Sequence, residues 1–249
     1  MKFRHYIPVL LILFISVGIL IFARMNMVDR YEYVIYLDNL VRAEKATVQL
    51  SIKNEEGRAV LCTAFVIQKN KNKYKFATVA HCFLREDKSY TINTILESDI
   101  LIFIENDNGG GFRVIKGAKL TSIEYKDNGP DFAVVEVEVD TPLPILQPYE
   151  GELEVGQCVF NISYPNINRG DVFYGYITKL NIKPKYFGNI EYPRDNIKIH
   201  FESLEDAHGA SGSAILDCDS GQVIGILVEQ RDDVVALTYE MFKKFYESK

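Results

Sequence analysis

The chain has 249 residues, of which 47% are hydrophobic and 25% charged, and its formal net charge is −6. This composition is ordinary for a globular protein, and the length suits one large all-β domain or two small ones. Since the chain has no basic excess, we do not expect a nucleic-acid partner.

The amino-terminal part of the chain contains an uncharged apolar run over residues 7–23, with Lys2 and Arg4 before it. The length of this run is near the lower limit for a membrane-spanning helix. It predicts an uncleaved anchor within residues 1–28, with the basic flank in the cytoplasm and the remainder exported. A cleaved signal peptide, leaving a secreted protein, is the alternative, although no clear small-x-small cleavage site precedes Arg24.

A charged and aromatic juxtamembrane segment over residues 29–45 follows, with a short helix expected across Leu37–Ala46. From Thr47 onward the alternation of apolar and polar residues is typical of β-strands. The lysine-rich run Lys69–Lys75 is interpreted as a solvated hairpin tip. The strands expected in the first half are Thr47–Ile52, Val60–Gln68, Tyr74–Ala80, Leu101–Ile104, Phe112–Ile115, Leu120–Tyr125 and Phe132–Val139.

The proline-containing stretch Thr141–Gly151 is the natural linker to a second half, which has a similar pattern of short strands. Residues Thr238–Ser248 alternate apolar and charged side chains at helical spacing and predict a C-terminal helix. Many short strands with frequent turns favour an all-β barrel or sandwich. The strands expected in the second half are Gln157–Tyr164, Asp171–Leu180, Asn196–Glu202, Ser213–Leu216 and Val223–Gln230.

Three short segments carry candidate chemistry in the order His, Asp, Ser. His81 lies in Ala-Thr-Val-Ala-His-Cys, Asp131 opens the run Phe-Ala-Val-Val, and Ser211 lies in Gly-Ala-Ser-Gly-Ser. A serine hydroxyl is a poor nucleophile that needs a base, and imidazole titrates near neutrality. Each residue has a simpler role as a structural histidine, a strand cap or a turn serine, but the three together favour a nucleophilic triad.

With these flanking sequences, the chain resembles the trypsin/chymotrypsin-like serine proteases over most of residues 46–249. The resemblance implies two six-stranded antiparallel β-barrels, the first over about 46–140 and the second over about 150–249, with the active site between them. It further implies that His81 is the general base, Asp131 orients it and Ser211 is the nucleophile. The backbone N–H groups of Gly209 and Ser211 would form the oxyanion hole.

Four cysteines are present, and their number is compatible with an exported protein. The spacings do not match a zinc knuckle, and three pairings are open on spacing alone. The resemblance selects Cys62 with Cys82 and Cys158 with Cys218.

The chain departs from the digestive members of the family around the serine. Ala210 replaces the Asp that pairs there with a new N-terminus on activation, so the cleavage-activated switch should be absent. Ser213 and Ala214 replace the usual Gly-Pro, and a serine at the first position is more similar to bacterial glutamyl endopeptidases.

Substrate specificity is weakly encoded. By offset from Ser211, Glu205 falls near the base of the primary specificity pocket, and Asp206 is an equally good candidate for this position. The alternative is that both acids are solvated loop residues. The extended segment Val228, Glu229 and Gln230 would pair with substrate backbone. His208 beside the oxyanion loop and His200 on a strand face are interpreted as non-catalytic.

The sequence therefore predicts a membrane-anchored, extracytoplasmic serine endopeptidase that acts on polypeptides through an acyl-enzyme and needs no metal or cofactor. A catalytically inactive protease-fold module that binds a partner is the main alternative. An esterase is disfavoured, because the Gly-x-Ser-x-Gly motif of those hydrolases would require glycine at position 213, where this chain has serine. The oligomeric state is not predicted.

Overall fold

The structure of the chain is a computed structural model. It describes residues 36–53, 59–84, 99–105, 111–125, 130–164, 170–181, 196–202, 208–230 and 234–247. The apolar run over residues 7–23 and its basic flank lie outside these ranges, so the anchor stays a prediction. Among the described residues no helix is long and apolar enough to cross a bilayer.

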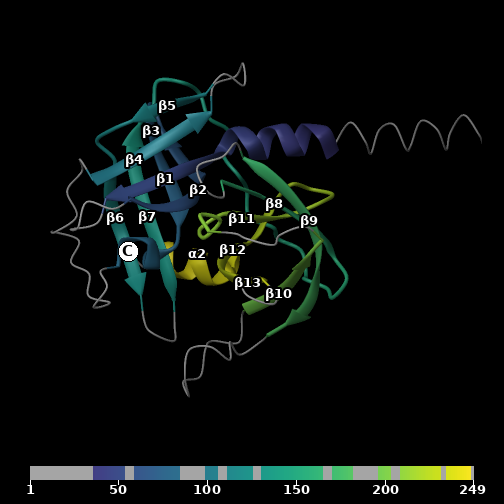
Figure 1. The fold of residues 1–249 in the computed structure, drawn as a ribbon. Helices are drawn as coiled ribbons and strands as arrows, with labels where there is room; N and C mark the ends of the chain where they lie inside the picture. Colours follow the sequence, from purple (N-terminus) through teal and green to yellow (C-terminus); the bar gives the residue numbers. More distant parts are fainter. Residues whose placement is uncertain are drawn as a thin grey trace, which may run out of the picture.

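The first half forms one seven-stranded sheet in the order β5-β4-β1-β2-β3-β7-β6, seen on the left of Figure 1. The seven strands match those expected from alternation in the sequence. The closed six-stranded barrel implied by the resemblance is not what the described residues form, because β5 and β6 are the edges of the sheet. Alternation identifies strands, but it does not encode which edges meet. The strands are β1 (Thr47–Lys53), β2 (Ala59–Asn70), β3 (Lys73–Thr78), β4 (Ile100–Glu105), β5 (Phe112–Ile115), β6 (Lys119–Tyr125) and β7 (Asp131–Glu138).

The prediction of a solvated hairpin tip over Lys69–Lys75 is wrong in extent. β2 and β3 remain paired as far as Asn70↔Lys73, so only Lys71 and Asn72 form the turn. Lys71 takes a positive φ of 59°. Charged side chains favour a loop in the sequence pattern, but the outer end of a hairpin leaves such side chains in solvent, where a strand tolerates them.

The second half is a closed six-stranded barrel in the order β10-β13-β12-β11-β8-β9. Strand β13 was not predicted, because its short apolar sequence Val-Val-Ala-Leu-Thr directly precedes the helix. It closes the barrel by pairing with β10 and β12. The expected C-terminal helix is confirmed. The elements are β8 (Cys158–Ser163), β9 (Asp171–Leu180), β10 (Asn196–Phe201), β11 (Ala214–Asp217), β12 (Val223–Gln230), β13 (Val234–Thr238) and α2 (Tyr239–Glu247).

The linker and the N-terminal helix both connect the two halves. In the linker, Leu146 N–H donates to Val66 of β2, while Tyr149 N–H donates to Val223 of β12. The expected short helix is confirmed over residues 36–46, the purple helix in Figure 1. Its Asn39 amide donates to the carbonyl of Asp219 at 3.0 Å, so this helix is bonded to the second half as well.

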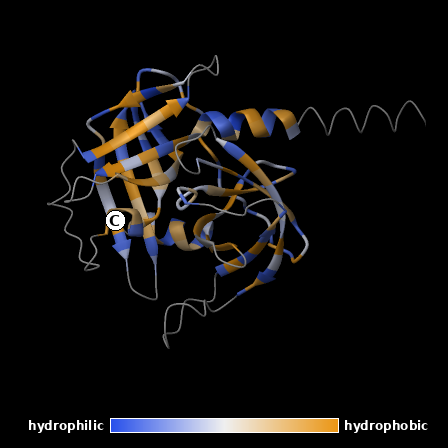
Figure 2. Cartoon of the chain, in the orientation of Figure 1, coloured by the Kyte–Doolittle hydropathy of each residue, from blue (hydrophilic) through white to orange (hydrophobic). Residues whose placement is uncertain are grey.

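The core crosses the boundary between the halves. Helix α2 presents Phe242 and Phe245 to Phe132 of β7, with ring centroids 5.5 and 5.6 Å apart. All three rings are buried. Figure 2 shows long hydrophobic stretches in the strands of both halves, whereas the N-terminal helix alternates hydrophobic and hydrophilic bands.

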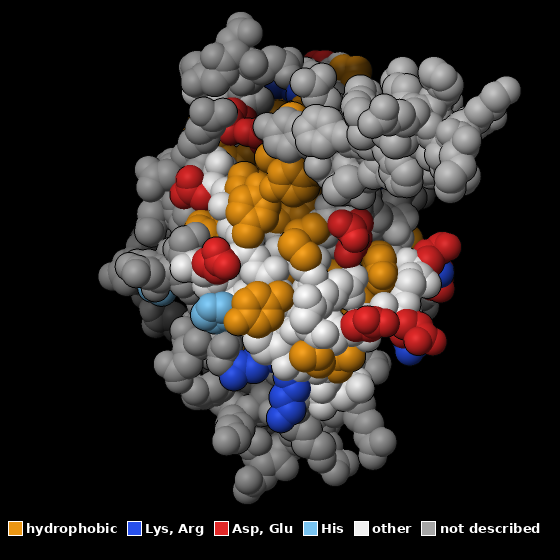
Figure 3. Space-filling model, turned by 90° about the vertical axis from the view of Figure 1, so that its right-hand side faces the viewer, with side chains coloured by type: hydrophobic (Ala, Val, Ile, Leu, Met, Phe, Trp, Pro, Cys, Tyr) orange, Lys and Arg blue, Asp and Glu red, His pale blue; other side chains and the backbone are white. Residues whose placement is uncertain are grey.

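The outer face of the second barrel is chemically mixed. Tyr174 and Tyr176 of β9 are 37% and 44% exposed, and the Tyr176 ring lies 5.5 Å from the ring of His200. Figure 3 shows acidic and basic side chains interspersed with hydrophobic ones on this side of the molecule. His200 thus lies on an exposed strand face, as expected.

Candidate active site

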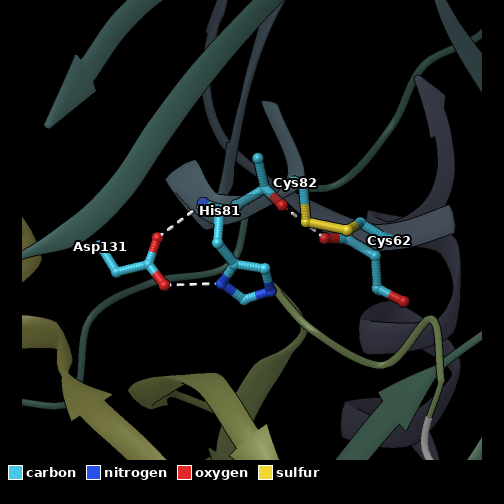
Figure 4. Close-up of polar contacts among 6 residues, drawn as sticks. Cys62, His81, Cys82 and Asp131 are labelled. Carbon is cyan, nitrogen blue, oxygen red and sulfur yellow. Dashed lines mark hydrogen bonds and ion pairs between the residues drawn. A yellow bond between two sulfur atoms is a disulfide. The ribbon is translucent and has the colours of Figure 1, made fainter. Parts of the chain in front are cut away.

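His81 and Asp131 form a two-point contact (Figure 4). The imidazole Nδ1 lies 2.6 Å from Asp131 Oδ2, and the backbone N–H of His81 donates to Oδ1 at 2.8 Å. The histidine side chain is 33% exposed and the aspartate side chain only 9%. Both carboxylate oxygens are therefore used by one residue, which fixes the position and the orientation of the imidazole.

The register of the first sheet brings this pair together. β3 and β7 are antiparallel, with Thr78 opposite Ala133, so the carboxyl end of β3 meets the start of β7. The short 3-10 helix η2 (Ala80–Phe83) then turns His81 toward Asp131. The apolar residues after Asp131 bury β7, which holds the carboxylate at the edge of the core.

Both expected disulfides are present. Cys62 of β2 is bonded to Cys82 of η2, with the Cα atoms 6.5 Å apart, and this bond lies directly beside His81 (Figure 4). Cys158 at the start of β8 is bonded to Cys218 after β11. The first bond attaches the segment that carries His81 to the middle of the first sheet.

Residues 209–213, here named the serine turn, directly precede β11 of the second barrel. Gly209 and Gly212 have φ of +100° and +88°, a conformation that glycine adopts without steric cost. The Ala210 carbonyl accepts a hydrogen bond from Ser213 N–H at 3.0 Å, which closes the turn.

The serine turn is bonded to the first sheet through Thr63 of β2. Thr63 N–H donates to the Ser211 carbonyl at 2.9 Å, and the Thr63 hydroxyl donates to the Gly209 carbonyl at 2.8 Å. Because Thr63 follows Cys62, one hydrogen bond and one disulfide separate Ser211 from Cys82, the neighbour of His81. The three candidate residues thus come from segments that are directly connected.

The two departures from the digestive proteases have structural counterparts. Ala210 is fully buried among the apolar residues inside the second barrel. The hydroxyl of Ser213 accepts a hydrogen bond from the buried Asn161 amide of β8 at 2.7 Å, and the same amide donates to the Ala214 carbonyl. The serine at position 213 therefore bonds the turn to the barrel wall.

The predicted specificity residues are only partly described. Glu205 and Asp206 lie outside the described residues. The register of β11 with β12 begins at Ala214↔Ile226, and Leu227 bonds to the serine turn. Val228–Gln230 therefore extend past the first residue of β11, as a substrate-pairing strand would. His208 is exposed beside the turn.

Sequence reasoning missed three buried polar residues around the serine turn. Besides Thr63 and Asn161, the hydroxyl of Thr78 donates to the Thr63 carbonyl at 2.8 Å. All three are fully buried, and the residues on either side of each along the chain are buried and apolar. A buried polar side chain must find a hydrogen-bond partner, so a polar residue between two apolar ones was the available signal.

The family model of the trypsin-like peptidase domain matches residues 62–226. The chain belongs to this family. The match begins at Cys62 and includes His81, Asp131 and the serine turn. No curated protein matches the sequence of the chain.

Solved structures of the protease Rv3671c from M. tuberculosis have a similar fold. Its active form has a TM-score of 0.62 at 18% identity, covering 84% of this chain and 82% of that chain. The inactive form of its serine-to-alanine mutant has a TM-score of 0.59 at 16% identity, covering 84% and 90%. At such low identity these matches show the fold of this trypsin-like peptidase domain alone.

A side chain at position 212 has no room. A Cβ built on Gly212 would lie 2.2 Å from the Thr78 hydroxyl and 2.3 Å from the Thr63 carbonyl. We expect Gly212→Ala to be less stable than Gly156→Ala by about 1–3 kcal/mol in urea unfolding, the usual cost of overpacking. Gly156 is the matched control, because its φ is +91° and nothing lies within 4 Å of its Cβ position. Equal losses would contradict the tight fit of the serine turn against β2 and β3.

Proposed function

We propose that this protein is a serine endopeptidase in which His81, Asp131 and Ser211 act as a triad. The observation that carries the proposal is the two-point contact between His81 and Asp131 beside a serine turn bonded to Thr63. The contact engages Nδ1 of the imidazole, so in the proposed triad Nε2 is the general base.

The short contact at Nδ1 determines which nitrogen of the His81 imidazole carries the proton. An ionised carboxylate only accepts hydrogen bonds, so Nδ1 carries the proton and Nε2 the lone pair. Nε2 then accepts the Ser211 proton as Oγ attacks the scissile carbonyl carbon. The buried carboxylate of Asp131 stabilises the imidazolium, which next donates its proton to the leaving amine. Water then attacks the acyl-enzyme through the same series of proton transfers.

The developing negative charge requires backbone donors. In the proposed site the N–H groups of Gly209 and Ser211 bind the oxyanion, and the positive φ of Gly209 supports this assignment. Ala210 supports a turn that needs no newly formed N-terminus, because its methyl group is buried in the barrel core. Removing one oxyanion donor typically costs roughly 100- to 1000-fold in rate.

Substrate would bind as an added strand. We propose that the backbone of Val228–Gln230, on the side left open before β11 begins, pairs with an extended polypeptide. Main-chain pairing of this kind is independent of side chains, so sequence preference would come from the pockets that flank the strand. The acid that selects the substrate residue, Glu205 or Asp206, stays a prediction.

Replacing Ser211 tests the nucleophile. Ser211→Ala should abolish labelling by a fluorophosphonate probe and peptide hydrolysis, because the variant lacks the proposed nucleophile. Peptide mapping of the labelled wild-type protein should identify Ser211. Ser220→Ala is the control, since this hydroxyl bonds only within the turn at Asp217 among the contacts described. Labelling of a different serine would refute the assignment, and the absence of labelling in the wild type would favour an inactive binding module.

Replacing Asp131 tests the orienting carboxylate. In Asp131→Asn the amide can donate to Nδ1, which favours the wrong tautomer, and kcat should fall by about 10,000-fold. Asp217→Asn is the matched control, because Asp131 and Asp217 are both 6% exposed and both carboxylates accept hydrogen bonds. It should lower stability and leave kcat of the folded enzyme nearly unchanged. Near-normal turnover of Asp131→Asn would mean that another acid has the role.

We propose further that the peptidase domain is extracytoplasmic and anchored by residues 7–23. The two disulfides support an oxidising compartment, since cytosolic proteins rarely keep structural disulfides. The basic residues Lys2 and Arg4 support an orientation with the amino terminus in the cytoplasm.

The anchor is tested by fractionation. The full chain should stay with membranes after alkaline extraction, and added protease should reach residues 46–249 only from the non-cytoplasmic side. A variant that lacks residues 1–28 is the control and should be released into the soluble fraction. A mature protein that begins after Ala23 would instead favour the cleaved signal peptide.

A further inference from the structure

Thr63 makes four hydrogen bonds from the middle of β2 although it is no member of the proposed triad. Two of them bind the serine turn at Gly209 and Ser211. The other two join Thr63 to Tyr164, just after β8, and to Thr78 at the end of β3. Thr63 is fully buried, so solvent does not compete for these bonds.

We propose that the Thr63 hydroxyl is a positioning residue of the oxyanion hole, an inference that rests on the proposed serine peptidase function. The hydroxyl accepts a hydrogen bond from Tyr164 N–H at 3.1 Å and lies 2.8 Å from the Gly209 carbonyl. A hydroxyl has one proton to donate. Because the Tyr164 N–H occupies an acceptor position, the proton points at Gly209.

The bond restrains the part of the turn that is otherwise free to rotate. Gly209 has no Cβ, and its φ of +100° is one of several conformations open to glycine. The carbonyls of Gly209, Ala210 and Ser211 accept bonds from Thr63 Oγ1, Ser213 N–H and Thr63 N–H, respectively. In a planar trans peptide each N–H points opposite to the preceding carbonyl. The Ser211 N–H belongs to the same peptide as the Ala210 carbonyl, so the Ser213 bond sets its direction, and the two Thr63 bonds hold the peptides on either side.

Among the hydrogen bonds of Thr63 to the serine turn, only the bond from its hydroxyl to the Gly209 carbonyl depends on the residue type at position 63. The Thr63 N–H and carbonyl would bond in the same way from any residue of β2 except proline. Only the hydroxyl distinguishes threonine from valine, which has nearly the same shape. Without it the Gly209 peptide loses its only described side-chain partner, and the buried Tyr164 N–H loses its acceptor. Thr63 thus couples the first sheet to the geometry of the oxyanion hole.

The test compares Thr63→Val and Thr63→Ser with the wild type in kcat, KM and the rate of fluorophosphonate inactivation. For Thr63→Val we expect kcat and the inactivation rate to fall together, by about 10- to 100-fold, less than the loss of a whole donor. KM should change less than about twofold, because the strand that would bind substrate is untouched. Thr63→Ser keeps the hydroxyl and should restore most of the activity.

Two controls separate positioning from stability. Thr47→Val removes an equally buried hydroxyl, bonded to the Ala43 carbonyl at 2.8 Å, and should leave kcat of the folded protein unchanged. All rates are corrected for the folded fraction measured by circular dichroism. If Thr63→Val does not fold, Thr63→Ala replaces it, because its smaller side chain lets water reach Tyr164 N–H.

The outcomes are distinct. Wild-type kcat per folded molecule in Thr63→Val, or in Thr63→Ala if that variant is needed, would overturn the inference. Failure of Thr63→Ser to restore activity would also overturn it, because the hydroxyl would then not be the group that matters. If the wild-type protein itself resists the fluorophosphonate, the proposed serine peptidase function fails, whatever the variants do.

Discussion

The arrangement of the candidate site depends on one constraint, the need to satisfy the backbone polar groups of a turn that packs against a buried strand. The serine turn cannot use strand pairing for its carbonyls, and solvent is largely excluded where it meets β2. Thr63 and Ser213 supply the missing donors. The approach is close enough that Gly212 has no space for a methyl group. Both halves of the chain must therefore be in place before the turn has its observed form.

The two halves contribute different kinds of order to the site. His81 is held by the first sheet through the Asp131 carboxylate and a covalent bond between neighbouring segments, and neither contact involves the second barrel. The proposed nucleophile Ser211 is held from two sides, by β2 through Thr63 and by β8 through Asn161 and Ser213. The proposed base thus has both of these contacts within one half, while the proposed nucleophile and oxyanion hole depend on both halves.

The sequence predicted the features that are local and missed those that depend on how distant segments meet. His81, Asp131 and the glycines around Ser211 were recognisable because their neighbours along the chain carry the pattern. The pairing of β3 with β7 brings His81 to Asp131, and only the resemblance implied that meeting. The closed barrel expected in the second half is confirmed, although its strand β13 was not predicted because it is too short to be distinguished from the helix that follows it. The closed barrel expected in the first half is wrong for the described residues, because nothing in the sequences of β5 and β6 indicates that they are edge strands. The roles of three buried polar residues could not be predicted, because the role of such a residue depends on a hydrogen-bond partner from a distant segment. These residues are Thr63, Thr78 and Asn161.

The contact of Phe132 with Phe242 and Phe245 has a consequence for the order of folding. Phe132 adjoins Asp131 in the first sheet, whereas its two aromatic neighbours lie in α2, near the end of the sequence. Contacts between residues so far apart close a long loop, and their entropic cost makes folding slow. During synthesis the strand that starts at Asp131 would stand without its aromatic cover until the last helix emerges. The packing of the strand that carries Asp131 therefore depends on a helix that is made much later in synthesis than the strand itself.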